Sequence, residues 1–387
     1  MRDGYRVFDC DTHVTPMAET LDPYLGPELR ARVPDLEQRK VEFKTGWAGE
    51  KLEPPYRHMY RLGGQGRGGW GNGKPRYLGE AETRESDRDF QTFMGSRFPT
   101  QGGADWDVDV RVRDMDEEGV DVHMMVPNGA NGAEDPWVEM EFIRANNRWL
   151  NDTCGKYPHR LKSLIAVTPR SLDASVAEIK RWSDSTWAVG VQPHLPLDYP
   201  LDHPDLEPVW QAANDAGLTI VHHSFASGYP GYRDLWDNPF LGRLGSHPWA
   251  AMRAVAAFFG AGVMDRYPNI RFAILESGFG WLPFWARRMD DQAVYMGYVN
   301  EHLQHKLSEY FTLGRFFAAI VIHEGEDMVR MVADDFGDHV LMFGSDYPHA
   351  ESRFPDSVDK VLGWKSITPE HMQKLMWDNP VRCFGEP

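Results

Sequence analysis

Acidic and imidazole side chains recur at every second position where one apolar run near the N-terminus ends. The stretch VFDCDTHVTP places Asp9, Asp11 and His13 there. Alternate residues of a β-strand face the same side, so we expect these three side chains to share a face. Carboxylates are costly in a protein interior unless a cation or hydrogen bonds compensate their charge. Taken alone, the pattern leaves open a metal site or a capping aspartate followed by an ordinary surface histidine.

Three later apolar runs end in groups of the same kind. TIVHHSF ends in His222 and His223, FAILESGFGW contains Glu276, and HVLMFGSDYPH contains Asp346. Neutral imidazoles and carboxylates that converge on one point bind divalent zinc, iron or manganese. Because four separate runs end in such groups, we predict that the first strand ends in polar residues in order to supply a metal site.

Strand-like runs alternate with helical patterns along most of the chain, which predicts parallel strands joined by helical crossovers. Eight strands close a (β/α)8 TIM barrel, whose active site lies at the carboxyl ends of the strands. The predicted strands are Tyr5–Asp11, Val120–Val126, Leu161–Val167, Trp187–Gln192, Leu218–His223, Ile270–Leu275, Glu309–Leu313 and His339–Gly344. The predicted helices are Trp137–Lys156, Leu172–Ser183, Pro204–Ala216, Pro248–Arg266, Leu282–Tyr298 and Gly325–Phe336.

A long segment, residues 17–110, interrupts this alternation directly after the first strand. It contains RLGGQGRGGWGNGKPR, which has no periodicity and little apolar surface to bury. We predict a single barrel domain over residues 1–387, in which 17–110 is an insertion. The insertion forms a lid or an oligomer contact, or else it is a disordered surface loop.

Composition narrows the class of protein. The formal net charge of −17 argues against a nucleic-acid partner, because such partners are bound mainly by neutralising phosphates with Lys and Arg. The longest apolar-rich run, residues 250–264, is too short to span a membrane and contains Arg253. Three scattered cysteines favour a reducing compartment, and the N-terminus lacks a signal-peptide pattern. We therefore expect a cytoplasmic enzyme without nucleic-acid or membrane partners.

These motifs together resemble the amidohydrolase superfamily, in the amidohydrolase-related branch that includes aminocarboxymuconate-semialdehyde decarboxylase and resorcylate-type decarboxylases. The resemblance rests on D-x-H in the first run, the histidine ending the fifth, GSDYPH in the eighth, and the phrases DRYPNIRFAILESGFGWLPFWARRMD and WDNPVRCFG. It covers the chain apart from the insertion. It implies a (β/α)8 barrel and a divalent metal whose core ligands are Asp11, His13, His222 and Asp346.

The sequence departs from the branch in ways that point to a second ion. Many members carry H-x-H or E-x-H in the first strand, and its decarboxylases place a histidine where this chain has Glu276. With His223 added, the set holds more ligands than one zinc requires. It is similar to a small subset of the branch that uses dinuclear iron or iron–manganese sites for O2-dependent hydroxylation, such as the platensimycin-pathway diiron hydroxylase and aminoisobutyrate hydroxylase.

Several residues keep alternative roles at this point. Glu276 is a ligand or pairs with Arg287 or Arg288, and His223 is a ligand of the second ion or a group that contacts a ligand. Asp9 is expected to orient a ligand. His349 is expected to contact substrate or the surroundings of Asp346. His247 ligates the second ion, lies near the metal site without touching the ions, or is simply a turn residue before a proline. A similar ambiguity holds for His194.

The resulting prediction is an O2-dependent hydroxylase with two ions, Fe/Fe or Mn/Fe, that acts on a small organic substrate. Asp346, Glu276 and His223 are its candidate catalytic residues. Its ligands would be Asp11, His13, His222, His223, Glu276 and Asp346. The alternative is a mononuclear zinc or manganese hydrolase, or a non-oxidative decarboxylase of a carboxylic acid, with Asp346 as base. A third possibility is a metal-stabilised subunit without turnover. The chain is expected to form a homo-oligomer or to pair with a homologous barrel subunit.

Overall fold

An eight-stranded parallel sheet forms the centre of the molecule, and its strands follow one another around the sheet in chain order. The computed structural model describes residues 1–46, 51–62, 103, 106–127, 133–196, 199–223 and 239–387. The strands of this sheet are β1 (Phe8–Val14), β4 (Val122–Pro127), β5 (Leu161–Val167), β6 (Ala188–Pro193), β7 (Thr219–His223), β8 (Arg271–Leu275), β9 (Phe316–Ala319) and β10 (Leu341–Met342).

The two ends of the sheet meet between β1 and the segment that follows β10. The Asp346 amide donates to the Asp11 carbonyl oxygen at 2.8 Å, and the His13 amide donates to the Tyr347 carbonyl oxygen at 2.6 Å. A parallel bridge joins Thr12 to Tyr347 between these bonds. The sheet is therefore nearly closed, and the predicted (β/α)8 barrel is confirmed.

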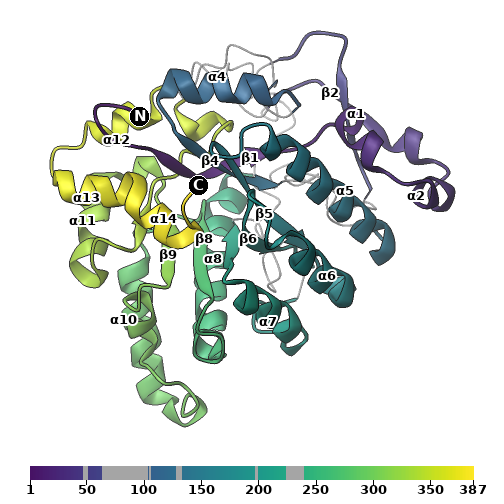
Figure 1. Cartoon of the computed structure of the whole chain (residues 1–387). Helices are drawn as coiled ribbons and strands as arrows, with labels where there is room; N and C mark the ends of the chain where they lie inside the picture. The colour runs from purple at the N-terminus through teal and green to yellow at the C-terminus, as the bar shows by residue number, and fades with distance from the viewer. Residues whose placement is uncertain (47–50, 63–102, 104–105, 128–132, 197–198, 224–238) are drawn as a thin grey trace, which may run out of the picture.

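Helices lie between successive strands and surround the sheet, and further helices near the C-terminus cover the region where β1 meets β10 (Figure 1). Their bounds are α4 (Val108–Glu118), α5 (Pro136–Gly155), α6 (Leu172–Trp182), α7 (Glu207–Ala216), α8 (Pro239–Gly260), α9 (Val263–Arg266), α10 (Leu282–Tyr295), α11 (Gly325–Phe336), α12 (Ser357–Leu362), α13 (Pro369–Gln373) and α14 (Asn379–Phe384). Among the described residues, no helix is both long enough and apolar enough to cross a bilayer.

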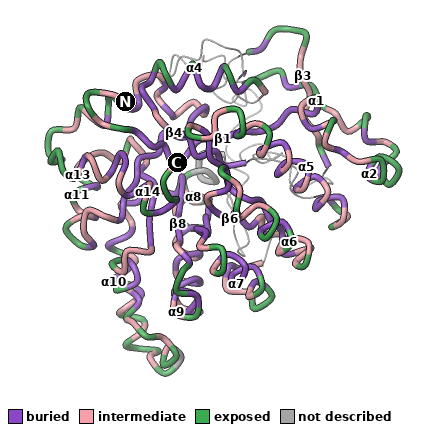
Figure 2. Tube along the Cα trace, viewed as in Figure 1, coloured by how far each residue is buried: buried purple, intermediate pink, exposed green. Residues whose placement is uncertain are grey.

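Buried hydrophobic side chains form two main clusters, an inner layer inside the barrel and one between the strands and the surrounding helices. Figure 2 shows that buried residues run along the central strands, while exposed residues concentrate in the outer loops and helix ends. The inner layer collects residues from around the sheet, and these identify the inward face of each strand. Its strand members are Phe8, Cys10, Val122, Met124, Val126, Leu164, Val221, Ala273, Leu275, Phe317, Ala319 and Met342.

The segment after β1 contains regular structure where the structure describes it. Short helices α1 (Ala18–Leu21) and α2 (Pro27–Arg32) precede an antiparallel pair, β2 (Lys40–Phe43) and β3 (Arg57–Tyr60). Helix α4 begins at Val108, inside the predicted insertion. The glycine- and arginine-rich run falls almost entirely outside the described residues. The insertion's role as a lid or an oligomer contact stays a prediction, as does the single-domain assignment.

One predicted strand was wrong. Residues 309–311 of the predicted Glu309–Leu313 strand belong to a 3-10 helix, Leu307–Phe311, and the seventh barrel strand is β9, a few residues further on. Tyr310 and Phe311 are buried in this helix, so their apolar character reflects packing outside the barrel. The four residues of β9, FFAA, are too few to show a period by themselves.

Candidate metal centre

A register shift in β1 brings two of the predicted ligands to the mouth of the barrel. The pairing of β1 with β4 shifts between Asp9 and Thr12. Phe8 and Cys10 point into the barrel, so strict alternation would turn the side chain of Asp11 outward. Such shifts re-aim side chains and are common next to active sites. Asp11 therefore reaches the mouth by this irregularity and not by the simple alternation that the sequence predicted.

Strand β7 alternates regularly, and this decides which of its two adjacent histidines faces the mouth. Val221 belongs to the inner layer, so His223 shares its face and His222 lies on the opposite face. The Nε2 atom of His223 lies 3.5 Å from Oδ1 of Asp11 and 3.2 Å from Oε2 of Glu276. His222 is buried but belongs to neither group of converging ligand atoms. The geometry thus favours His223 for the position that the sequence assigned to His222.

Two ligand candidates adopt left-handed backbone conformations. Glu276 follows the inward-facing Leu275 and has a φ of 48°, while Asp346 has a φ of 68°. Residues other than glycine rarely adopt this region, which costs of order 1–3 kcal/mol and is found most often at functional sites. If the alternation of β8 had continued, the Glu276 carboxylate would point outward. The left-handed conformation instead directs it into the barrel mouth.

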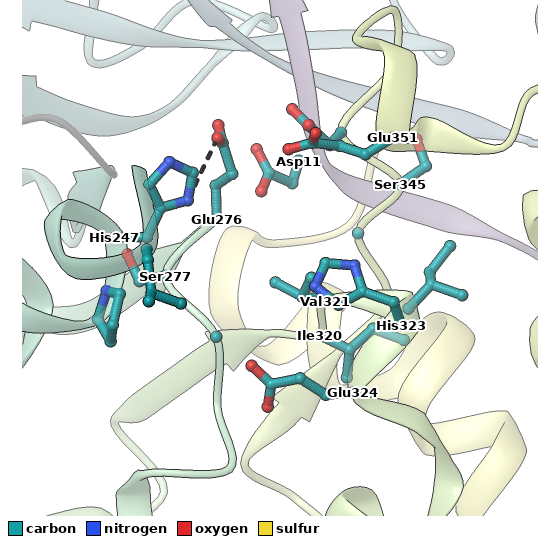
Figure 3. Close-up of a pocket in the computed structure, with 16 residues that line it drawn as sticks. Asp11, His247, Glu276, Ser277, Ile320, Val321, His323, Glu324, Ser345 and Glu351 are labelled. Atoms are coloured by element: carbon teal, nitrogen blue, oxygen red, sulfur yellow. Dashed lines mark ion pairs between the residues drawn. The ribbon is translucent and has the colours of Figure 1, made fainter. Parts of the chain in front are cut away.

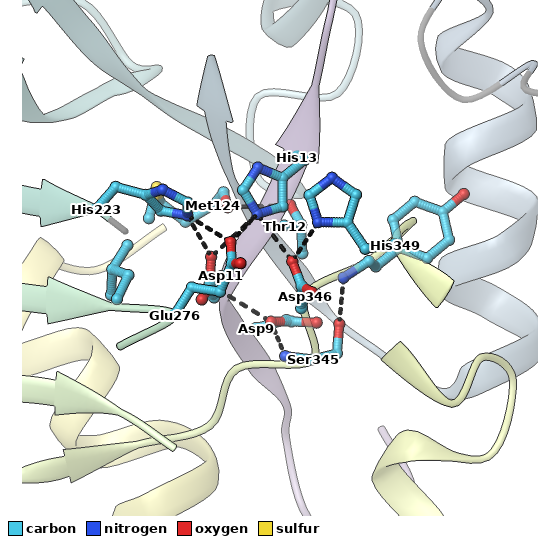
Figure 4. Close-up of polar contacts among 12 residues, drawn as sticks. Asp9, Asp11, Thr12, His13, Met124, His223, Glu276, Ser345, Asp346 and His349 are labelled. Carbon is cyan, nitrogen blue, oxygen red and sulfur yellow. Dashed lines mark hydrogen bonds and ion pairs between the residues drawn. The ribbon is translucent and has the colours of Figure 1, made fainter. Parts of the chain in front are cut away.

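The imidazole of His13 lies at the centre of the cluster (Figure 4). Its Nε2 atom is 3.0 Å from Oδ1 of Asp346, 3.3 Å from Oε2 of Glu276 and 3.6 Å from Oδ1 of Asp11. The Nδ1 atom of His349 lies 2.6 Å from the same Asp346 oxygen, and the rings of His349 and His13 stack at 4.2 Å. Together with His223 on β7, residues from four segments of the barrel thus converge on one buried point.

The donor atoms form two overlapping groups that share His13. One contains His13, Glu276, Asp346 and His349, the other contains Asp11, His13 and His223, and within each group the atoms lie within 4.8 Å of one another. Three buried carboxylate oxygens, Asp11 Oδ1, Glu276 Oε2 and Asp346 Oδ2, accept no hydrogen bond of normal geometry from any described residue. Buried carboxylate oxygens in this state, beside imidazole nitrogens, fit a divalent cation.

The protonation of the cluster follows from its geometry. Burial alone would lower the pKa of His223, but Asp11 and Glu276 raise it to about 9. Burial would likewise raise the pKa of Glu276, yet the adjacent imidazoles of His13 and His223 hold it well below its usual value. Burial, followed by the charge of His223, lowers the pKa of His222 to about 3. The two adjacent histidines therefore differ in charge, and the one inside the cluster carries a proton that a cation would displace.

A second set of buried groups fixes the backbone beneath the ligands. Oδ1 of Asp9 accepts from the amides of Asp11 at 3.2 Å and Ser345 at 3.0 Å, so it joins the two segments that close the barrel. This arrangement agrees with the orienting role that the sequence suggested for Asp9. The guanidinium of Arg111, on α4, donates to the His13 carbonyl oxygen and lies over the ring of Tyr347 at 5.1 Å.

A cavity of about 490 Å³ opens beside the cluster (Figure 3). Asp11, Glu276 and Asp346 form its polar end. Leu244, Pro248, Ile320, Val321 and Ile322 supply apolar surface, and His247, His323, Glu324 and Glu351 supply further polar groups. The arrangement suits a small organic molecule with one end at the carboxylates and imidazoles.

The remaining predicted residues can be placed individually. His247 reaches the cluster, with Nδ1 3.7 Å from Oε1 of Glu276. The alternative ion pair between Glu276 and Arg287 is wrong, because Arg287 binds Asp335 through both terminal nitrogens at 2.8 Å. His194 is half-buried, and desolvation together with the charge of His223 lowers its pKa to about 4.

Sequence reasoning missed several residues that shape this centre. Arg111 is separated from His13 by 98 positions, and Glu324 contacts the segment after β8 from a turn 45 residues away. Both act through backbone atoms. No spacing or composition signal in the sequence could have revealed them, because such contacts depend on which loops meet in the fold.

Comparisons with known proteins bear on the whole chain. The sequence profile described as Amidohydrolase matches residues 8–385. A 2-amino-3-carboxymuconate-6-semialdehyde decarboxylase from Dictyostelium discoideum is 21% identical over 253 residues, which is 63% of this chain and 67% of that protein.

Similar solved structures share the fold over nearly the full chain. The 5-carboxyvanillate decarboxylase of Sphingomonas paucimobilis has a TM-score of 0.69 and 19% identity, covering 99% of this chain and 100% of that one. The corresponding enzyme of Novosphingobium aromaticivorans, complexed with manganese and 4-hydroxy-3-methoxy-5-nitrobenzoic acid, has a TM-score of 0.68 and 17% identity, covering 99% and 97%. The profile match over almost the entire length shows that this chain belongs to the amidohydrolase family.

Proposed function

We propose that this protein is a metal-dependent decarboxylase that removes CO2 from a small carboxylic acid without an external oxidant. The observation that carries the proposal is the set of three buried carboxylates and three imidazoles beside a cavity of substrate size. Decarboxylases recur among the similar proteins, and some of those structures contain manganese. This is the alternative that the sequence analysis left open, and nothing in the comparisons supports its first choice, the hydroxylase.

In this proposal Asp11, His13, His223 and Asp346 hold one divalent ion, manganese or zinc, and Glu276 completes the set. The ion would supply positive charge that orients the carboxylic acid and stabilises negative charge in the transition state. The apolar wall at Ile320–Ile322 packs against the rest of the substrate and keeps water from the reacting carbon.

The protein must also deliver a proton. When the bond to the carboxylate carbon breaks, CO2 leaves and the electron pair stays on the substrate carbon, which then takes up one proton. Asp346 lines the cavity and shares a 2.6 Å hydrogen bond with His349, so this pair holds a proton next to the substrate. We assign proton delivery to Asp346, with His349 resupplying it.

The second candidate is the dinuclear O2-dependent hydroxylase. One observation favours it: the donor atoms fall into two groups that share His13, as two neighbouring ions would require. In that case Glu276 and Asp346 serve one ion, and Asp11 and His223 serve the other.

One experiment separates these functions. The protein is loaded with manganese, zinc or iron and analysed for bound metal, and it is then incubated with a panel of hydroxybenzoates and related unsaturated acids. We expect about one ion per chain and CO2 release without O2 consumption, lost in Asp346→Asn. Two ions with substrate-dependent O2 consumption would establish the hydroxylase instead. Hydrolysis of an amide or ester panel without CO2 release would establish the mononuclear hydrolase.

A further inference from the structure

The turn after β8, residues 276–281, contains Glu276 and leads into α10. A carboxylate from the next barrel loop holds this turn in place. Glu324 ends a 3-10 helix (Ile322–Glu324) after β9. Its Oε2 atom accepts from the amides of Gly280 at 2.7 Å and Phe279 at 3.1 Å, and its Oε1 atom lies 3.3 Å from the Phe279 amide. Both oxygens are thus engaged by backbone amides of one short turn.

Two glycines allow the carboxylate to approach this closely. A Cβ atom on Gly278 would collide with Oε1 of Glu324, and one on Gly280 would lie 3.0 Å from Oε2. Gly278 also has a φ of 67°, which a larger residue adopts only with strain. The sequence ESGFGW therefore has glycine at both positions where the turn wraps around the Glu324 carboxylate.

Other hydrogen bonds of the turn are local. The indole Nε1 of Trp281 donates to the carbonyl oxygens of Ser277 at 2.9 Å and Gly278 at 3.1 Å, and the hydroxyl of Ser277 donates to the Leu275 carbonyl oxygen. These bonds shape the turn, and Glu276 at its start faces His13 and His223. Glu324 adds hydrogen bonds that join the far end of the turn to the loop after β9.

We propose that Glu324 is a positioning residue that holds Glu276 toward His13 and His223 and so preorganises the cation site. The left-handed conformation at Glu276 costs energy, so it persists only when the surrounding structure enforces it. Groups that orient metal ligands typically contribute about 10- to 100-fold to metal affinity. The inference rests on the proposed function only in that the cluster binds a divalent cation.

The test measures Mn²⁺ binding to metal-free full-length protein by calorimetry, without substrate. We expect Glu324→Ala to weaken binding by about 10-fold. Glu324→Gln should show a smaller loss, because its amide oxygen can still accept. Hydrogen exchange of the Phe279 and Gly280 amides should become faster in Glu324→Ala. Wild-type affinity and wild-type exchange in a folded Glu324→Ala protein would overturn the proposal.

A matched control lies on the adjoining helix. Glu326 also accepts from a backbone amide at 2.6 Å, but that amide belongs to Ser366 and not to the turn after β8. Glu326→Ala should therefore leave Mn²⁺ affinity unchanged, and an equal loss in both variants would also contradict the proposal. If Glu324→Ala fails to fold, Gly280→Ala can replace it, because the added methyl group would push the Glu324 carboxylate away from the turn. An unchanged Mn²⁺ affinity in Gly280→Ala would contradict the proposal. Failure of the wild-type protein to bind Mn²⁺ would refute the cation site itself.

Discussion

The Nε2 atom of His223 lies 3.2 Å from Oε2 of Glu276, although a regular strand delivers one residue and a left-handed turn delivers the other. The neighbouring His222 lies on the opposite face of the same strand. We therefore expect His223→Asn to lower Mn²⁺ affinity by more than about 10-fold, because it removes a nitrogen from the cluster.

The matched variant His222→Asn should retain Mn²⁺ affinity even if it lowers thermal stability. Titration of both metal-free variants by calorimetry makes the comparison. The reverse ranking would show that His222 is the ligand, as the sequence first suggested.

Metal binding should stabilise the folded protein. The cluster collects three carboxylates whose oxygens a cation would neutralise, and a ligand that binds only the folded state adds about 2.7 kcal/mol at 100 times its dissociation constant. We expect Mn²⁺ to raise the urea midpoint and a chelator to reverse the shift. The same addition should have a much smaller effect on Asp346→Asn. An identical Mn²⁺ response in this variant would place the ion elsewhere.

Arg111 should contribute to stability through the backbone of β1. It is fully buried, and its guanidinium donates to the His13 carbonyl oxygen. Removing a charged hydrogen-bond donor costs about 1.5–3 kcal/mol, so Arg111→Met should lower the free energy of unfolding by this amount.

Arg113 lies on the same helix and is exposed, which makes Arg113→Met the control. Urea unfolding followed by circular dichroism measures both variants. Equal effects at the two positions would mean that the loss reflects helix α4 and not the contact with His13.

Glu118 gives the folded protein a pH dependence separate from the metal site. Burial raises its pKa from 4.5 to about 7, while its carboxylate accepts from the Ser357 amide at 3.1 Å and from the Ser357 hydroxyl. Because the folded state retains a proton that the unfolded state has lost, stability falls as pH rises from about 4.5 to about 7.

Glu118→Gln removes this dependence but keeps an oxygen that accepts from Ser357. The variant should match wild type near pH 4.5 and be more stable by up to about 3 kcal/mol at pH 8, since each pKa unit corresponds to about 1.4 kcal/mol. Urea unfolding across this pH range measures the difference, with Glu117→Gln on the exposed side of the helix as control. A difference that does not vary with pH would contradict the assignment.

The sequence predicted the barrel and the region of its site because both follow from local patterns. Apolar runs separated by helical spacing indicate a parallel sheet, and polar residues at the ends of those runs must meet at one edge. Strand β5 was placed with its observed bounds, Leu161–Val167. Asp346 also appears where its run indicated, at the closure of the barrel.

Other details depend on the three-dimensional arrangement of the chain. Which of His222 and His223 faces inward depends on how β7 is oriented in the barrel. The sequence cannot decide this, because both histidines follow the same apolar run. Glu276 reaches the cluster through a positive φ, which alternation cannot indicate. The seventh strand is only four residues long and follows a 3-10 helix whose buried Tyr310 and Phe311 resemble the residues of a strand.

Two of the hydrogen bonds that close the barrel involve ligand candidates, since the Asp346 amide donates to the Asp11 carbonyl oxygen and the His13 amide donates to the Tyr347 carbonyl oxygen. During synthesis the first strand leaves the ribosome more than three hundred residues before its partner. A nascent chain must therefore keep an acidic, incomplete barrel mouth until the segment after β10 has been synthesised. The same segment therefore completes both the cluster of candidate metal ligands and the β-sheet contacts that close the barrel.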